Sequence, residues 1–327
     1  MAKIMSTSSS DRKKVLIVQY SQSGQLTRIV ENIAGPLIAS ESVQTKIVTI
    51  EPEKPFPFPW PILTFFNIFP ECVYLEPPEI KPIEIEPNER FDLIIFSYQV
   101  WFLSPSLPAT AFLQSDIAKQ VFKDTPVITL IGCRNMWTQA QQTVTQLLSQ
   151  LGAKLIDNIV LVDQGSTLAS FITTPRWLLT GRKNAFWGFP PAGISEADIN
   201  SASRFGAAIV DGLGKDKERM NQPLLNGLGA VNADVALIQS EKIGYRSFRI
   251  WGKLLRLIGD QHSFVRKIVL IVYILFLIGM ILTVVPITMI VKTLLRPFLK
   301  AQHQQLKEIF EQPSGSGTER KEEFTCQ

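Results

Sequence analysis

The sequence VLIVQYSQSGQLTRIVENIA, residues Val15–Ala34, decides the fold of this chain. Its apolar start, Val15–Val18 with Tyr20, is typical of a buried β-strand. A short turn rich in serine, Ser21–Gln25, follows, and apolar residues then recur at helical spacing. We therefore expect a strand that passes through a tight turn directly into a helix.

The turn offers several hydrogen-bond donors to an anion. A helix N-terminus presents free N–H groups and a partial positive charge, and the hydroxyls of Ser21, Ser23 and Thr27 add donors. The turn lacks both the GxGxxG pattern and the lysine of a nucleoside-triphosphate loop. It could hold a phosphate group, or it could be an ordinary strand-to-helix connection.

The same turn resembles the FMN-phosphate loop of the flavodoxin superfamily, whose pattern is Ser/Thr-x-Thr-Gly-x-Thr. Ser21, Ser23 and Gly24 follow this pattern, whereas Leu26 stands where the last threonine is usual. The resemblance implies an FMN cofactor, and it marks seven consecutive residues as cofactor-binding: Ser21, Gln22, Ser23, Gly24, Gln25, Leu26 and Thr27.

Strand and helix patterns alternate over the following residues. Nearly continuous apolar runs or short alternating segments predict four more strands, at Lys46–Ile50, Phe91–Ser97, Pro126–Gly132 and Leu155–Val162. Five strands separated by helices predict an α/β fold with a doubly wound, five-stranded parallel sheet. The excursion to the second strand fits the flavodoxin strand order 2-1-3-4-5.

The segment after the third strand carries a second resemblance. Its sequence, YQVWFLSPSLP from Tyr98 to Pro108, looks like the flavin-flanking loop of flavodoxin-like NAD(P)H:quinone oxidoreductases. The resemblance implies that Val100, Trp101 and Phe102 lie against the isoalloxazine ring, and it suggests NAD(P)H as an electron donor.

The loop after the fourth strand borders the flavin in flavodoxins. Asn135 and Trp137 are therefore further candidates for cofactor binding, and Cys133 and Arg134 are candidate catalytic residues. Arg134 could stabilise an anionic reduced flavin or an enolate. Cys133 could act as a nucleophile or a weak donor, or it could simply fill a tight turn.

Two insertions, residues 51–90 and 163–193, interrupt the regular alternation. Both are rich in aromatic residues, and five tryptophans should lie at the carboxyl edge of the sheet: Trp60, Trp101, Trp137, Trp177 and Trp187. We expect these rings and insertions to roof a wide apolar cavity for a hydrophobic substrate. Two alternatives are a satellite core beneath long loops and, for residues 51–90, a flap over a sheet edge.

The carboxyl-terminal part is strongly apolar and explains the mean hydropathy of +0.14. Residues Ile268–Val291 carry no charge, which predicts a membrane helix, and cations flank this run as anionic lipid headgroups would require. The N-terminus has no apolar core of a secretory signal, so we expect the main domain to be cytoplasmic, anchored to a bacterial inner membrane. The expected organisation is a disordered N-terminus (1–12), a flavodoxin-like domain (13–213), a linker (214–244), a basic interfacial helix (245–266), a membrane helix (267–292) and a polar tail with a disordered end (293–327).

The composition excludes several function classes. The two histidines, His262 and His303, lie beside the apolar run, so the domain has none for a catalytic triad or a zinc site. Three widely spaced cysteines suggest neither a disulfide framework nor a metal site. The net charge of +4 is modest, and its cations cluster beside the apolar run, so we expect no nucleic-acid partner and no metal.

Taken together, residues 13 to 300 resemble bacterial proteins named dialkylresorcinol condensing enzymes. That resemblance rests on the first loop, the FPFPW…FF…FPEC insertion, YQVWFLSPSLP, GCRNMW and the apolar carboxyl-terminal run. It implies a ketosynthase-type partner and either participation in a condensation or oxidation of a cyclohexanedione to a resorcinol. We favour a membrane-anchored FMN oxidoreductase, because a condensing enzyme needs an acyl-carrying cysteine with histidine partners. The alternatives are an electron carrier to a membrane partner and a flavin-free lipid-binding module.

Overall fold

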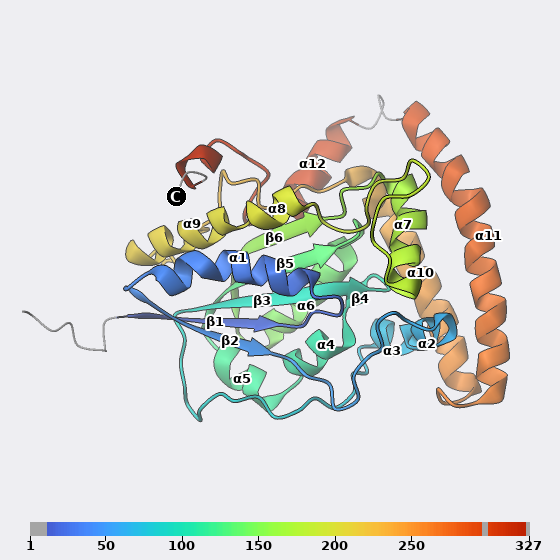
Figure 1. Cartoon of the computed structure of the whole chain (residues 1–327), viewed down its shortest axis with the longest axis horizontal. Coiled ribbons are helices and arrows are strands. Elements are labelled where there is room, and N and C mark those ends of the chain that lie inside the picture. Colours follow the sequence, from blue (N-terminus) through green and yellow to red (C-terminus); the bar gives the residue numbers. More distant parts are fainter. Residues whose placement is uncertain (1–11, 296–299, 325–327) are drawn as a thin grey trace, which may run out of the picture.

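The computed structural model describes residues 12–295 and 300–324 and is built around a parallel sheet (Figure 1). Five parallel strands run in the order β2-β1-β3-β5-β6, which is the order 2-1-3-4-5 counted along the chain. The bounds are β1 Lys13–Gln19, β2 Val43–Thr49, β3 Leu93–Trp101, β5 Pro126–Cys133 and β6 Lys154–Val162. The predicted flavodoxin-like topology of the parallel strands is therefore confirmed.

A sixth strand corrects the prediction of five. The short strand β4, Ser104–Pro105, pairs antiparallel with the end of β3, where Val100 lies opposite Pro105. Strand β3 accordingly continues to Trp101 instead of ending at Ser97. The expected flavin-flanking loop is thus the end of a strand followed by a hairpin.

Helices cover both faces of the sheet. One face carries α1 (Gln25–Ala39), α8 (Glu196–Asn200) and α9 (Ser203–Gly214), and the other carries α4 (Leu107–Leu113), α5 (Asp116–Phe122) and α6 (Thr138–Gln150) (Figure 1). Helix α9 approaches α1 most closely at Gly206, where a Cβ would lie 2.0 Å from the carbonyl oxygen of Ile33. Any larger residue at this position would push the two helices apart.

The first insertion is folded. It contains the short helices α2 (Ile62–Asn67) and α3 (Phe69–Tyr74), and α3 packs against α10 (Val235–Ile258). At Gly252 of α10, a Cβ would lie 3.3 Å from the side chain of Val73. The insertion thus joins the sheet domain to the carboxyl-terminal helices.

The second insertion contributes α7 (Thr167–Thr180), which is only lightly packed. Ser170 and Thr173 are its only buried residues. One backbone hydrogen bond, from the N–H of Trp60 to the carbonyl oxygen of Leu178 (2.9 Å), links it to the first insertion. Helix α7 therefore covers the carboxyl edge of the sheet without belonging to the main core.

Two long helices follow α9, and their limits differ from the predicted ones. Helix α10 begins at Val235, so the last part of the expected linker 214–244 is helical. The polar side chain of Asp234 caps this helix by accepting a hydrogen bond from the N–H of Ala236 (3.0 Å). The apolar helix α11 extends over Phe264–Leu295, beyond both ends of the expected segment 267–292.

Arg266 does not serve as a lipid-facing cation. Its side chain is 2% exposed and donates to the carboxylate of Glu71 (2.8 Å) and to the carbonyl oxygen of Asn67 (2.7 Å). A buried guanidinium needs such partners, because water no longer solvates it. The start of α11 is therefore fixed to the first insertion.

The polar tail is also folded, which corrects the expectation of a disordered end for residues 313–324. Helix α12 (Lys300–Glu311) leads to the buried Ser314, whose hydroxyl donates to the Asp157 carboxylate (2.7 Å) and accepts from the N–H of Asn158 (2.7 Å). A short 3₁₀ helix, η2 (Lys321–Phe324), follows. Residues 1–11 and 325–327, also expected to be disordered, lie outside the described residues.

Candidate functional site

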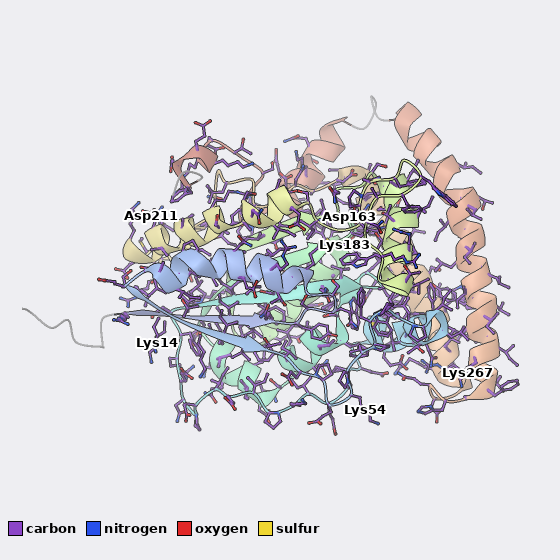
Figure 2. The ribbon with its side chains drawn as sticks, in the orientation of Figure 1. Lys14, Lys54, Asp163, Lys183, Asp211 and Lys267 are labelled. Carbon is purple, nitrogen blue, oxygen red and sulfur yellow. The ribbon has the colours of Figure 1, made fainter. Side chains whose placement is uncertain are left out.

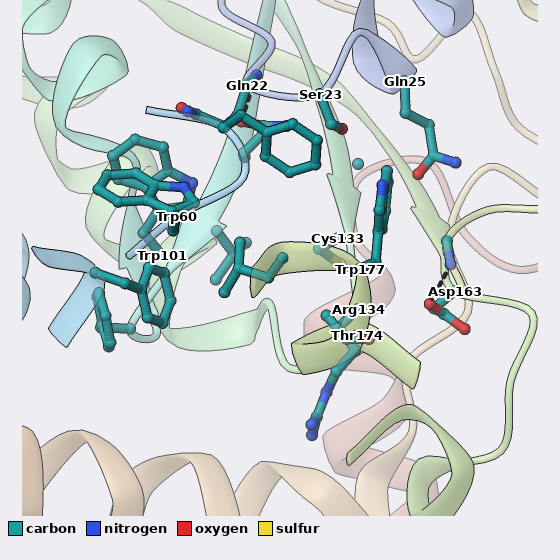
Figure 3. A pocket seen from close by; sticks show the side chains of 18 residues that line it. Gln22, Ser23, Gln25, Trp60, Trp101, Cys133, Arg134, Asp163, Thr174 and Trp177 are labelled. Carbon is teal, nitrogen blue, oxygen red and sulfur yellow. Dashed lines mark hydrogen bonds between the residues drawn. The ribbon is translucent and has the colours of Figure 1, made fainter. Parts of the chain in front are cut away.

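A cavity of about 190 Å³ lies at the carboxyl edge of the sheet, beside the point between the parallel strands β1 and β3 where the strand order reverses (Figure 3). Eight of the predicted site residues line it: Gln22, Ser23, Gln25, Val100, Trp101, Phe102, Cys133 and Arg134. Six predicted residues do not: Ser21, Gly24, Leu26, Thr27, Asn135 and Trp137.

The turn before α1 has the features of an anion site. Gly24 adopts a left-handed conformation (φ +78°) as the N-cap, and no side chain caps the helix. The first N–H groups of α1 are consequently free of intrahelical partners. The hydroxyl oxygen of Ser21 is buried and has no partner among the described residues, and Ser23 lines the cavity.

Two glutamines of this turn hold neighbouring segments. The Gln22 amide nitrogen donates to the carbonyl oxygens of Phe56 (3.0 Å) and Pro57 (2.9 Å). The Gln25 side chain accepts from the N–H of Ile194 (3.2 Å). Gln22 therefore fixes the first insertion against the turn, and Gln25 fixes the residue that directly follows the second insertion. Neither side chain is free to bind a phosphate.

Leu26 points into the protein core. It is 2% exposed, and a Cβ on Gly132 would lie only 3.2 Å from its Cδ1 atom. The residue therefore packs beneath the turn and does not contact a ligand in the cavity. Thr27, one position later, also lies off the cavity wall.

The predicted ring-stacking residues sit in a tight hairpin. Phe102 (φ 49°) and Leu103 (φ 60°) both adopt left-handed conformations between β3 and β4. Two-residue hairpin turns of this kind usually contain asparagine and glycine, so bulky residues here carry backbone strain. The hairpin directs Trp101 toward the first insertion.

Most of the aromatic residues at this edge pack against one another as a part of the main core. The Trp101 ring lies edge-on to those of Phe56 (centroids 5.1 Å apart) and Trp60 (5.7 Å), and Phe102 packs against Phe65 (4.7 Å). Trp60 and Trp101 are buried. The expectation of a wide cavity is therefore not met, because the rings that line the cavity pack against one another and leave a volume of only about 190 Å³.

The remaining tryptophans behave differently from one another. Trp137 is 2% exposed and packs below the cavity at the start of α6, whereas Trp187 is 93% exposed. Trp177 of α7 lines the cavity and reaches Gly193, where a Cβ would lie 3.1 Å from its ring (Figure 3). Among the tryptophans, Trp177 therefore narrows the cavity most directly.

The two candidate catalytic residues lie at the end of β5. Burial raises the pKa of the Cys133 thiol, and the nearby Glu241 carboxylate raises it further, so the thiol stays protonated at neutral pH. This is unfavourable for the proposed nucleophile. Burial lowers the pKa of Arg134 to about 10, and its guanidinium stacks over the Phe171 ring of α7, 4.1 Å from the centroid.

Asp163 is a cavity residue at the start of the second insertion (Figure 3). Its carboxylate accepts hydrogen bonds from the N–H groups of Gly165 (2.7 Å) and Gly193 (2.5 Å). Burial raises its pKa despite these bonds. The residue thus closes the base of the insertion, and it connects α7 to the β5 loop through the backbone.

Sequence reasoning missed part of the cavity wall. Thr174, Leu178 and Gly193 carry no motif that marks them, because their place depends on how α7 folds back over the sheet. The tryptophan pattern did place Trp60 and Trp177 at this edge. Gln99 and Asp163 also line the cavity, with Phe58, Phe65 and Gly132.

Glu241 of α10 caps the helix that follows the β5 loop. Its carboxylate accepts from the Thr138 hydroxyl (2.6 Å) and from the N–H of Gln139 (3.1 Å), and the residue is 1% exposed. Burial raises its pKa to about 7 despite these bonds. The carboxyl group therefore gains a proton more readily in the folded chain than in the unfolded chain.

We expect Glu241 to make stability depend on pH. Since its folded pKa is the higher one, its contribution is greatest in acid and declines between about pH 4.5 and 7. Glu241→Gln removes the charge and should gain stability relative to the wild type over that interval. Chemical denaturation of both proteins at a series of pH values measures this difference, and a difference of opposite sign would contradict the assignment.

The site suits one end of an FMN better than the other. The uncapped α1 N-terminus and the orphaned Ser21 hydroxyl match a phosphate, which needs several donors. The apolar walls from Val100, Trp177 and Leu178 match a flat ring. The volume of about 190 Å³ is below the ~300 Å³ at which small-molecule pockets begin, so the ring requires α7 to shift outward.

No protein-family model matches the chain, and no curated protein matches it. Solved structures do. A flavoprotein in complex with FMN from Lactobacillus acidophilus NCFM shares 17% identity (TM-score 0.37), covering 46% of this chain and 93% of its own. Oxidised flavodoxin 1 from Bacillus cereus shares 12% identity (TM-score 0.34), covering 61% and 98%. With its parallel strands in the order 2-1-3-4-5, the chain described here has a flavodoxin-like fold.

Proposed function

We propose that this chain binds FMN and acts as an oxidoreductase on a hydrophobic substrate at a membrane. The observation that carries the proposal is the uncapped N-terminus of α1, with the partnerless Ser21 hydroxyl, at the carboxyl edge of a flavodoxin-like sheet. Ligands bind at this edge in open α/β sheets. The structures of flavoproteins with related folds are consistent with a flavin.

The chain's residues would divide the work of holding the cofactor. The N–H groups at the start of α1, with the hydroxyls of Ser21 and Ser23, would bind the phosphate. Val100, Trp177 and Leu178 would exclude water from the ring. A bound flavin would supply two-electron redox chemistry itself, so the domain would not need a histidine for acid–base catalysis.

Apolar surroundings favour an apolar substrate. Aromatic rings of the first insertion and helix α7 border the cavity. The one helix long and apolar enough to cross a bilayer, among the described residues, belongs to the same chain. We therefore propose a lipid-like quinone that is reduced with NAD(P)H as electron donor, or a lipid-like dione that is oxidised. Oxidation of a cyclohexanedione to a dialkylresorcinol, with a ketosynthase-type partner upstream, is the most specific form of this proposal. In that form two electrons and two protons leave the dione, and an electron acceptor such as a membrane quinone has to reoxidise the flavin.

The rate of flavin reoxidation by different quinones distinguishes an oxidoreductase from a simple electron carrier. The FMN-loaded protein is photoreduced without oxygen and mixed with quinones of increasing chain length in detergent. We expect reoxidation to accelerate with chain length, because the apolar walls bind the longer substrates more tightly. Rates that match those of free reduced FMN for every quinone would contradict an enzyme site.

A flavin-free lipid-binding module is the second candidate. The observation in its favour is the small cavity volume of about 190 Å³, which Trp177 limits from one side. In that case the cavity would accept an acyl chain instead of a ring. Binding of a fluorescent fatty acid that is not displaced by FMN would support this alternative.

A further inference from the structure

Helix α11 has the length and composition of a membrane span. Its first 21 residues, Phe264–Val284, are long and apolar enough to cross a bilayer, and their most apolar 18-residue stretch has a mean hydropathy of 2.7 and is 17% buried. A span would place the two ends of the helix on opposite sides of the bilayer, about 30 Å apart across the hydrocarbon core. If α11 spans the bilayer, the segments before and after it cannot both contact the same domain.

The first end is fixed to the sheet domain. Arg266 is buried against Glu71 of α3, as described above, and Leu270 and Tyr273 are also buried. The Tyr273 ring packs against Phe69, with centroids 4.7 Å apart. These contacts tie about the first three turns of α11 to the first insertion.

The other end leads back to the same domain. Helix α12 begins at Lys300, after only four residues, 296–299, which reach at most about 14 Å. The Glu311 carboxylate at the end of α12 accepts from the N–H of Ala233 (3.1 Å). Three residues further on, Ser314 is buried against Asp157 of β6.

The segment after Ser314 also contacts the sheet domain. The carbonyl oxygen of Gly317 accepts from the N–H of Gly229 (2.6 Å), and the N–H of Arg320 donates to the carbonyl oxygen of Gly227 (2.8 Å). Segments on both sides of α11 are thus packed on one body. A straight helix of 32 residues, about 48 Å long, cannot cross a bilayer and keep both sets of contacts.

One long face of α11 nevertheless remains apolar and exposed. Leu275 is 65% exposed and Leu282 is 70% exposed. Phe264, Ile268 and Ile271, which lie on the same face at helical spacing, are also exposed. Helix α10 adds an exposed stripe at helical spacing that alternates apolar and basic residues: Ile243, Arg246, Ile250, Lys253 and Leu257. Lys267 is exposed at the start of α11 (Figure 2). Apolar side chains beside cations match the surface of an anionic bilayer.

We propose that α11 lies in the plane of the membrane surface, with its exposed face in the lipid and the sheet domain and tail together on one side. The occupant of this face is a bilayer that contains anionic lipids. The proposal does not depend on the cofactor, because it uses only the packing at the two ends of α11. It predicts a one-sided anchor instead of a span.

Accessibility of two engineered cysteines tests the topology. His262→Cys precedes α11 and Gln305→Cys follows it, each in the full chain with Cys326→Ser, and the parent protein gives the background. An impermeant maleimide is applied to intact bacterial cells and to inside-out membrane vesicles. We expect both cysteines to react only in the inside-out vesicles. Reaction of the two from opposite sides would overturn the proposal.

Vesicle flotation tests the occupant. Leu275→Glu on α11 is compared with Ile309→Glu on α12, since both wild-type residues are 65% exposed. Leu275→Glu should weaken binding to phosphatidylcholine–phosphatidylglycerol vesicles at least about tenfold, and Ile309→Glu should not. Equal binding by both variants would contradict a lipid occupant. A wild-type protein that does not float with the vesicles and instead forms a dimer through α11 would contradict it as well. Neither readout requires flavin or activity.

Discussion

Replacing Gly24 with valine is expected to weaken FMN binding at least about a hundredfold. Gly24 holds φ at +78° directly before α1, and a β-branched residue strongly disfavours this region. The substitution would turn the first N–H groups away from the phosphate, and each charge-assisted hydrogen bond contributes about 1.5–3 kcal/mol. Loss of one or two such bonds corresponds to the predicted change in affinity.

Gly188→Val is the matched control for this prediction. Gly188 has nearly the same conformation (φ +81°), has equally open space around a Cβ and does not line the cavity. Both variants should lose similar stability, but only Gly24→Val should lose FMN. Titration of the purified proteins with FMN, followed by quenching of flavin fluorescence, gives both dissociation constants. Equal affinities would show that the turn does not hold the phosphate.

Replacing Trp60 with alanine is expected to destabilise the fold by about 3–5 kcal/mol. The Trp60 side chain is 2% exposed, and its ring contacts those of Phe56, Phe65 and Trp101. Its removal leaves a cavity that the surrounding rings cannot fill without losing their own contacts. The effect follows from this dense packing of rings, since a tryptophan with few ring contacts would contribute much less to stability.

Trp187→Ala provides the comparison within the same chain. Trp187 is 93% exposed, and substitutions at such positions usually change stability by less than about 0.5 kcal/mol. Urea denaturation of both variants, followed by far-ultraviolet circular dichroism, gives the two changes in the free energy of unfolding. Similar values for the two tryptophans would mean that the aromatic cluster is not a core.

The elements that could be predicted are those with local signals. The apolar run Val15–Val18, the serine-rich turn and the apolar face of α1 lie next to one another in sequence, so periodicity alone locates the strand and the helix. Ser195 and Asp198 likewise predict a capped helix, and the Ser195 hydroxyl accepts from the N–H of Asp198 (3.0 Å).

The features that could not be predicted depend on contacts between distant residues. Arg266 looks like one more cation beside an apolar run, and only the folded position of Glu71 makes it a buried ion pair. Ser314 sits in a polar tail that resembles disorder by composition, yet it completes the environment of Asp157. The same holds for Trp101, whose partners come from the first insertion.

In the candidate site, too, local features could be predicted from the sequence and long-range contacts could not. The position of the first turn follows from local pattern, but the roles of its side chains do not. Gln22 holds the first insertion, Gln25 holds the residue that directly follows the second, and Leu26 enters the core. Helix α7 determines the width of the cavity. The tryptophan pattern indicates that its segment covers this edge of the sheet, but not how closely the helix approaches the turn before α1.

The absorption spectrum of the purified, detergent-solubilised full chain tests the central claim most directly. We predict the bands of an oxidised flavin and, after denaturation, release of one FMN per chain. A chain purified without cofactor should regain these bands when FMN is added. A colourless protein that does not take up added FMN would contradict the account of the α1 N-terminus as a phosphate site.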